Sequence, residues 1–125
     1  MEQSNWQNLR AASRGSIQSL IVTVKALLYA RLWGGKFTFV PGDNIYVATG
    51  MRGGFARGGT TIGGVFLTRR VPSSALLRHE AIHADQWARY GLTFPVRYFW
   101  EEVRNPHAKN KFEIEAGLRD GGYSQ

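Results

Sequence analysis

Two histidines and a glutamate at residues 79 to 83 have the types and the spacing that metal-dependent hydrolysis requires. The sequence there is HEAIH, so His79 and His83 are four residues apart and Glu80 directly follows the first. On an α-helix, residues four apart lie on one face, and both imidazoles point the same way. Such a pair can bind one Zn²⁺, with Glu80 in reach of a water on the metal's open side. The pattern predicts a cofactor of one Zn²⁺ per chain, with His79 and His83 as ligands and Glu80 as general base.

Chance is a poor explanation for this pattern if two conditions hold. A random match in a chain of this length occurs on the order of 1 time in 300. The first condition is that the five residues lie on a helix. Ser73 or Ser74 can cap such a helix and Gly91 can end it, which predicts a helix of about 17 residues with the pattern near its middle. The second condition is a third metal ligand.

The third ligand must be a histidine or a carboxylate, because the chain contains no cysteine. Glu101 and Glu102 lie at the end of an expected helix and are expected to be solvated. His107 follows a proline in an expected loop, where it is either polar surface or a ligand. Glu113 and Glu115 lie on an expected last helix and point to different faces of it. The residues alone leave His107, Glu113 and Glu115 open.

The sequence FEIEAG at residues 112–117 resembles a second helix found in gluzincin-type metallopeptidases. In these enzymes an H-E-x-x-H helix is followed by an E-x-E-A-D or F-E-x-x-A-D pattern. Residues 79–118 are similar to the minimal, single-domain members, the minigluzincins. The resemblance implies a zincin-like fold, hydrolysis of peptide bonds in a peptide or protein substrate, and Glu113 as the third zinc ligand.

The resemblance also implies supporting residues around the metal. The last position of the pattern is usually an Asp that supports the site, and here it is Gly117, which removes a carboxylate that would orient a ligand imidazole. The possible compensating carboxylates are Asp85, Glu115 and Asp120. For the oxyanion, the candidates by chemistry are His107, Tyr123 and Arg97. An extended substrate is expected to pair with the strand before the motif helix, at Val65, Phe66 and Leu67.

The elements that position these residues follow from apolar periodicity and turn signals. A helix over 16–33, capped by Ser16, carries one apolar face: Ile17, Leu20, Ile21, Val24, Leu27, Leu28 and Leu32. We favour packing of this helix against a sheet, with contact to a membrane surface as the alternative. Strands are predicted at 37–40, 45–48 and 65–68, with a flexible glycine-rich connection at 50–64. A helix over 94–103, capped by Thr93, carries the apolar stripe Val96, Phe99, Trp100 and Val103, and a last helix spans 110–118.

These elements predict one α+β domain of 125 residues. It comprises an N-terminal backing helix, a short, mostly antiparallel sheet, the motif helix and C-terminal helices with the third ligand. Residues 1–15 are expected to be a flexible arm or a short helical lead-in. Because the N-terminus is polar and lacks the order of a signal peptide, we expect a cytoplasmic protein.

The net charge is +7, but the basic residues are scattered, so a solvated basic surface is favoured over nucleic-acid binding. Two rival hypotheses remain. One is a catalytically weak or inactive zinc-binding module that acts through a partner. The other is a basic binder of nucleic acid or of membrane surfaces in which the H-E-x-x-H is fortuitous.

Overall fold

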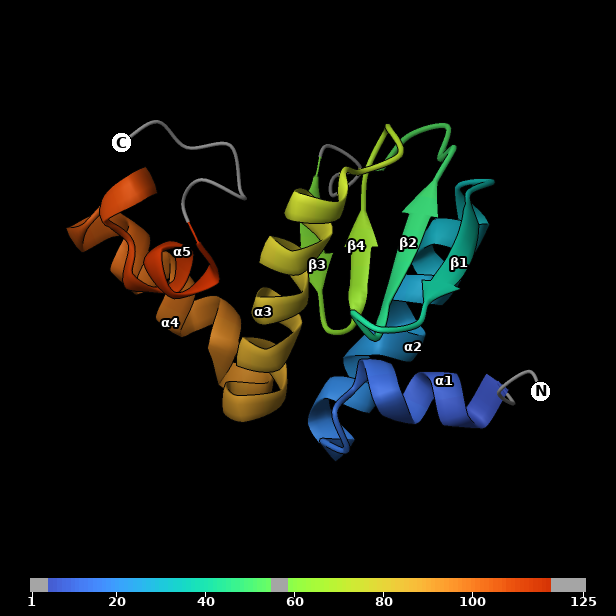
Figure 1. Ribbon diagram of the computed structural model, residues 1–125, viewed down its shortest axis with the longest axis horizontal. Helices are drawn as coiled ribbons and strands as arrows, with labels where there is room; N and C mark the ends of the chain where they lie inside the picture. Colours follow the sequence, from blue (N-terminus) through green and yellow to red (C-terminus); the bar gives the residue numbers. More distant parts are fainter. Residues whose placement is uncertain (1–4, 55–58, 118–125) are drawn as a thin grey trace.

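The computed structural model describes residues 5–54 and 59–117. They form a small α+β domain whose four-stranded sheet has helices on both faces (Figure 1). The strand order is β1-β2-β4-β3. β1 (Lys36–Val40) and β2 (Ile45–Thr49) form the predicted antiparallel hairpin, in which Val40 is opposite Ile45. β4 (Val65–Leu67) is parallel to β2 and antiparallel to β3, so the sheet is mixed with mostly antiparallel pairs, as expected.

The strand β3 (Thr60–Ile62) corrects the prediction of an unstructured glycine-rich connection. Thr60, Thr61 and Ile62 are β-branched, and β-branched side chains favour a pleated strand. Gly63 and Gly64 then form a two-residue turn into β4, with Gly63 at a φ of 59°. A Gly-Gly pair between two apolar runs is a hairpin signal, and the glycine content of residues 50–64 obscured it.

One face of the sheet is covered by α2 (Ile17–Leu32) and α1 (Asn5–Ala12). Of the two predictions for residues 1–15, the helical lead-in is thus correct for residues 5–12. Ser16 caps α2 as predicted, because its side chain accepts a hydrogen bond from the backbone N–H of Ser19 at 3.2 Å. Apart from Leu27, the α2 residues that are buried on this side are small: Ser19, Thr23, Ala26 and Ala30.

The prediction that the large apolar residues of α2 face the sheet is therefore wrong. Of the seven residues predicted to form it, only Leu27 is fully buried. Five of them (Ile17, Ile21, Val24, Leu28 and Leu32) are exposed. The helix does back the sheet, but it does so through its small side chains.

The opposite face of the sheet receives α3 (Ser74–Tyr90), which carries the H-E-x-x-H residues. The predicted boundaries are confirmed: the Ser73 hydroxyl accepts a hydrogen bond from the Leu76 N–H at 3.1 Å, and Gly91, with a φ of 60°, ends the helix. Ala84 of α3 packs with Ile45 and Phe66 in the core on this side. The first condition for a metal site, a helical setting, is met.

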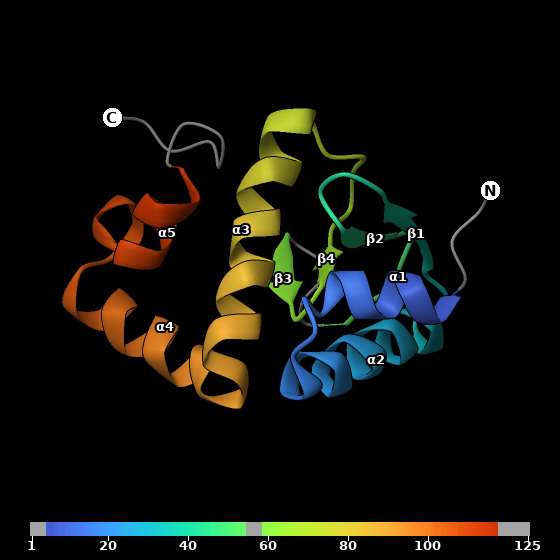
Figure 2. The same ribbon diagram turned by 60° about the horizontal axis from the view of Figure 1, so that its bottom comes forward.

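The C-terminal helices wrap back onto α3 (Figure 2). A 3₁₀ turn, η1 (Gly91–Thr93), leads into α4 (Phe94–Arg104), and a second turn, η2 (His107–Lys109), leads into α5 (Lys111–Ala116). The last helix was predicted over 110–118, but α5 ends at Ala116, where Gly117 with a φ of 96° stops it; residue 118 lies outside the described residues.

Two details of α4 differ from the prediction. Thr93 is itself in a helical conformation and its side chain does not cap α4, because η1 runs directly into the helix. The predicted apolar stripe of Val96, Phe99, Trp100 and Val103 is exposed, and α4 instead packs through Phe94, Tyr98 and Glu101. No helix in the described part of the chain is both long enough and apolar enough to cross a lipid bilayer.

Candidate metal centre

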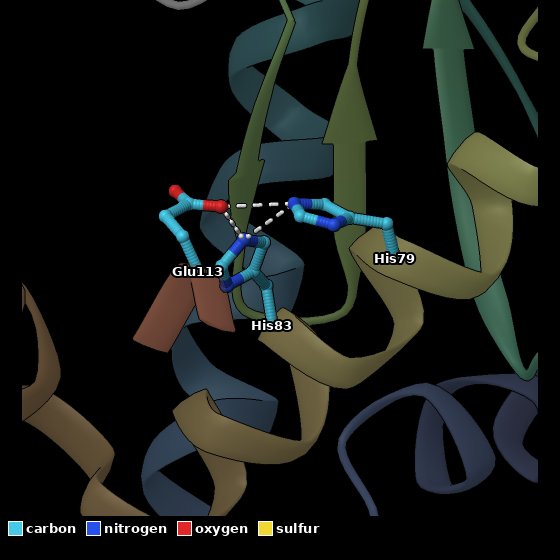
Figure 3. A group of neighbouring side chains, drawn as sticks. All are labelled: His79, His83 and Glu113. Carbon is cyan, nitrogen blue, oxygen red and sulfur yellow. Dashed lines mark hydrogen bonds and ion pairs between the residues drawn. The ribbon is translucent and has the colours of Figure 1, made fainter. Parts of the chain in front are cut away.

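His79, His83 and Glu113 converge on one point between α3 and α5 (Figure 3). His79 Nε2 lies 2.9 Å from Glu113 Oε1, His83 Nε2 lies 3.0 Å from the same oxygen, and the two Nε2 atoms are 3.1 Å apart. All three residues are buried. The structure therefore brings the predicted third ligand, Glu113, to the pair of histidines.

The hydrogen bonds at Nδ1 of the two imidazoles determine whether each Nε2 carries a proton or a lone pair. His79 Nδ1 lies 2.8 Å from the Gly117 carbonyl oxygen, and His83 Nδ1 lies 2.8 Å from Gln86 Oε1. Both partners are acceptors, so each Nδ1 carries the proton and donates. In the neutral rings each Nε2 then has a lone pair directed at the Glu113 oxygen, which is also an acceptor. Three lone pairs that meet in a buried site are unfavourable unless a proton or a metal ion lies between them.

The dimensions of this cluster suit Zn²⁺. Tetrahedral Zn²⁺ with bonds of about 2.0 to 2.1 Å separates its ligand atoms by about 3.3 Å. The three ligand atoms lie 2.9, 3.0 and 3.1 Å apart. An outward shift of about 0.3 Å would therefore accommodate the ion, and two imidazoles with one carboxylate are a ligand set that zinc uses in catalytic sites.

The pKa shifts of Glu113 and His79 indicate that the cluster stabilises the charged forms of this carboxylate and this imidazole. Burial alone would raise the pKa of the Glu113 carboxyl, but its contacts with His79 and His83 outweigh burial and hold that pKa well below its usual range. Burial alone would lower the pKa of His79, but its contacts with Glu113 and the Gly117 carbonyl outweigh this effect and raise it. A metal ion that bound to this site would have to compete with protons.

Gly117 supplies the support that its lack of a side chain was expected to remove. Its carbonyl oxygen accepts the hydrogen bond from His79 Nδ1 and thereby orients the ligand imidazole. Gly117 ends α5 with a φ of 96°, a conformation that side-chain-bearing residues rarely adopt. The acceptor for His79 Nδ1 is therefore a backbone carbonyl and not a side-chain carboxylate.

Gln86 supports the second histidine and was not predicted. Its amide orientation is fixed, because Nε2 donates to the Phe112 carbonyl at 3.0 Å and to Glu115 Oε1 at 2.8 Å, which leaves Oε1 for His83. Glu115, a predicted supporting residue, thus acts through Gln86 and does not touch a ligand directly. Gln86 lies three residues after His83 and four before Tyr90 on α3, and this spacing alone does not indicate that Gln86 supports the site.

Glu113 is positioned by its neighbours on α4 and α5. The preceding residue, Phe112, is buried against Trp87 and Phe94 in an aromatic cluster. The hydroxyl of Tyr98 donates to Glu113 Oε2, the oxygen that is turned away from the histidines. Tyr98 was not predicted either, although it lies one helical turn after Phe94, on the same face of α4.

Glu80 faces the same pocket from α3 and is bonded to the edge strand. The Thr61 hydroxyl of β3 donates to Glu80 Oε2 at 2.5 Å. Burial raises the pKa of Glu80 above its usual value, and the hydrogen bond from Thr61 partly offsets this rise. A carboxylate with a raised pKa is a stronger base, as proton abstraction requires.

The pocket around these residues has a volume of about 770 Å³. Its walls are β3, α3, α4 and Glu113, and its apolar lining includes Phe66, Leu76, Phe94, Pro95 and Phe99. The strand expected to pair with an extended substrate, Val65 to Leu67, does not lie at an edge of the sheet, so that prediction is wrong. β4 lies inside the sheet between β2 and β3, and all three of its residues are buried. Only the Phe66 side chain reaches the pocket, and the edge beside the site belongs to β3.

The structure does not bring the other predicted residues to the metal cluster. Asp85 is exposed and pairs with Arg14 at 2.6 Å. His107 is exposed in η2, where its backbone N–H donates to Glu102. Arg97 lies on the outside of α4 over the ring of Tyr90. Asp120 and Tyr123 lie outside the described residues.

Glu101 and Glu102, expected to be solvated, instead hold the connection between α4 and α5. Glu101 is buried, and its Oε1 accepts hydrogen bonds from the Asn105 side chain and the Lys111 N–H. Glu102 accepts from the side chain of Asn110, the residue that caps α5. These carboxylates therefore determine where α5, and with it Glu113, lies.

Comparisons of the chain with protein-family models, with curated proteins and with solved structures give no match.

Proposed function

We propose that the protein is a zinc-dependent hydrolase that cleaves peptide bonds, with the gluzincin-type arrangement that the sequence resembles. One observation carries this proposal. Three buried ligand atoms, from His79, His83 and Glu113, converge in a pocket that Glu80 also lines. A metal site that serves structure alone is usually closed by a fourth protein ligand. Within residues 5–54 and 59–117 the structure places three such ligands beside a pocket and a carboxylate, an arrangement that suits catalysis.

Each residue has a role in this proposal. When bound, Zn²⁺ supplies Lewis acidity toward a water and toward the oxygen of a scissile carbonyl. His79, His83 and Glu113 hold the ion, and Gly117 and Gln86 orient the two imidazoles. Glu80 takes a proton from the attacking water and passes it to the leaving amine.

The substrate is proposed to be an extended peptide that adds to the edge of β3. Gly59 to Ile62 line the pocket along this edge, and main-chain hydrogen bonds to an edge strand hold peptides largely independently of sequence. The apolar lining from Phe66, Leu76 and Phe94 would receive an apolar side chain beside the scissile bond.

The test combines metal analysis with digestion of a peptide library. The purified protein should contain one Zn per chain, and a chelator should abolish its peptide hydrolysis. Replacement of Glu80 by Gln should leave the metal content unchanged and lower kcat by about 100-fold or more, because general-base catalysis contributes about that factor. The matched control is Asp85→Asn on the same helix, which removes an exposed carboxylate and should retain both metal and activity.

Two results would count against the proposal. Full activity in the Glu80→Gln variant would exclude the proposed base. Stoichiometric zinc without hydrolysis of any peptide would support the rival hypothesis of a zinc-binding module that acts through a partner.

A further inference from the structure

The outward face of α2 carries a stripe of large apolar side chains. Ile17, Ile21, Val24, Leu28 and Leu32 recur every three or four residues and are 37% to 80% exposed. The face that packs on the sheet uses small residues instead. A helix of a soluble domain usually has its large apolar residues inside, so this reversed arrangement indicates that the stripe contacts something outside the chain.

Basic residues flank the stripe on both sides. At 100° per residue, Lys25 lies about 80° from Ile17 in one direction and Arg31 about 40° in the other. α2 contains no acidic residue, and Trp33 is exposed directly after its end. Long basic side chains at the edges of an apolar stripe can extend toward anionic groups while their stems cover apolar surface.

A second stripe of this kind lies on α4. Its outward residues Val96, Phe99, Trp100 and Val103 are 61% to 72% exposed, and Arg97 and Arg104 lie beside them. In Figure 2, α2 and α4 both lie along the lower edge of the view. The two helices meet at η1, where the Leu92 N–H donates to Gln18 Oε1 at 2.8 Å and the Leu92 side chain is itself exposed. We call the exposed apolar residues of α2, η1 and α4 together the α2–α4 surface.

Charge decides which partner fits the α2–α4 surface. A second copy of the chain would bring a surface with the same cations and no added negative charge, and each copy has a net charge of +7. An anionic lipid bilayer offers apolar acyl chains for the stripes and negative head groups for the flanking cations.

We infer that the α2–α4 surface binds anionic lipid bilayers, with α2 lying parallel to the membrane plane. The apolar side chains enter the boundary between head groups and acyl chains, and Lys25 and Arg31 contact phosphate and carboxylate groups. Exposed tryptophans such as Trp33 and Trp100 suit this interfacial region. The inference is independent of hydrolysis at the metal centre.

The test is co-sedimentation with large vesicles of phosphatidylcholine, with and without phosphatidylserine. The native protein should sediment with the vesicles that contain phosphatidylserine and much less with phosphatidylcholine alone. The Leu28→Gln variant should bind those vesicles about tenfold more weakly, because a buried leucine contributes about that factor. Val71→Gln, at an exposed apolar position in the loop between β4 and α3, is the matched control and should bind like the native protein.

A second pair of variants tests the charges. The change Lys25→Gln with Arg31→Gln should weaken binding to phosphatidylserine vesicles about tenfold. The control, Arg69→Gln with Arg70→Gln, removes the same charge from that loop and should have a smaller effect. Circular dichroism verifies that each variant is folded. The inference is overturned if the native protein stays in the supernatant with both kinds of vesicle. It is also overturned if the native protein is a dimer that Leu28→Gln makes monomeric and vesicle binding is unaffected, which would assign the surface to a second copy.

Discussion

Among the individual residues, the three that converge could be predicted from the sequence, but the groups that orient them could not. The spacing of His79 and His83 marks a helical chelate in the sequence, and the FEIEA segment indicates Glu113. Gln86 and Tyr98 have ordinary positions in their helices, and only the packing of α5 against α3 and α4 makes them partners of the ligands. The Gly117 carbonyl could not be found by residue type at all, because every residue has a carbonyl.

Substitution of Gly117 tests this backbone support. Gly117→Ala should weaken zinc binding about tenfold, because alanine is strained at a φ of 96° and the carbonyl would turn away from His79. Gly42→Ala is the matched control, since Gly42 has a φ of 94° and open space around it. That variant should lose stability without a change in zinc affinity, as measured by competition with a chromophoric chelator. Equal zinc affinity in Gly117→Ala and the native protein would show that the carbonyl is dispensable.

Among the elements, the helix boundaries were predicted well and the edge strand was not. Ser16 and Ser73 cap α2 and α3 as expected, because capping is a local property that the sequence contains in full. β3 is three residues long and pairs with β4 in a hairpin, whose Gly-Gly turn signal is obscured by the other glycines of residues 50–64. Its position explains why the Thr61 hydroxyl reaches Glu80, a contact between residues 19 apart in the chain.

The hydrogen bond from Thr61 of β3 to Glu80 predicts that removal of the Thr61 hydroxyl changes the pH dependence of hydrolysis. The hydrogen bond from Thr61 lowers the pKa of Glu80, so its loss in Thr61→Val should raise that pKa further. Because Glu80 must be deprotonated to act as a base, the acid limb of the kcat/KM profile should move to higher pH. Thr38→Val, at an exposed position on β1, should leave the profile unchanged. An unmoved acid limb in Thr61→Val would mean that another group determines it.

At the scale of the whole molecule, the α+β class was predictable and the outward faces of α2 and α4 were not. Periodicity identifies an apolar stripe, but it does not tell which side of a helix packs on the sheet. In α2 the small residues Ser19, Ala26 and Ala30 lie in the core in place of the larger side chains. The placement of α5 likewise depends on the buried Glu101, which was expected to be solvated, and on the buried Asn110.

The metal centre should also contribute to the stability of the whole domain. It joins α3 to α5 through residues 34 apart in the chain, so bound zinc would restrain the C-terminal helices. Chelation should lower the Tm by about 10 °C, as expected for a ligand present well above its Kd. The Glu113→Gln variant should lose most of this chelator-dependent shift in differential scanning calorimetry. If Glu115→Gln lost it and Glu113→Gln did not, the third ligand would be Glu115.

The carbonyl of Gly117 has one more consequence, which concerns acidity. A carboxylate in this place could take up a proton and would then stop accepting the hydrogen bond from His79. A peptide carbonyl does not ionise in the range in which proteins fold, so the tautomer of neutral His79 is set by the path of the backbone at any pH. Sensitivity to acid is then left to groups such as His79, Glu113 and Glu80, and the outer support of His79 stays constant while they titrate.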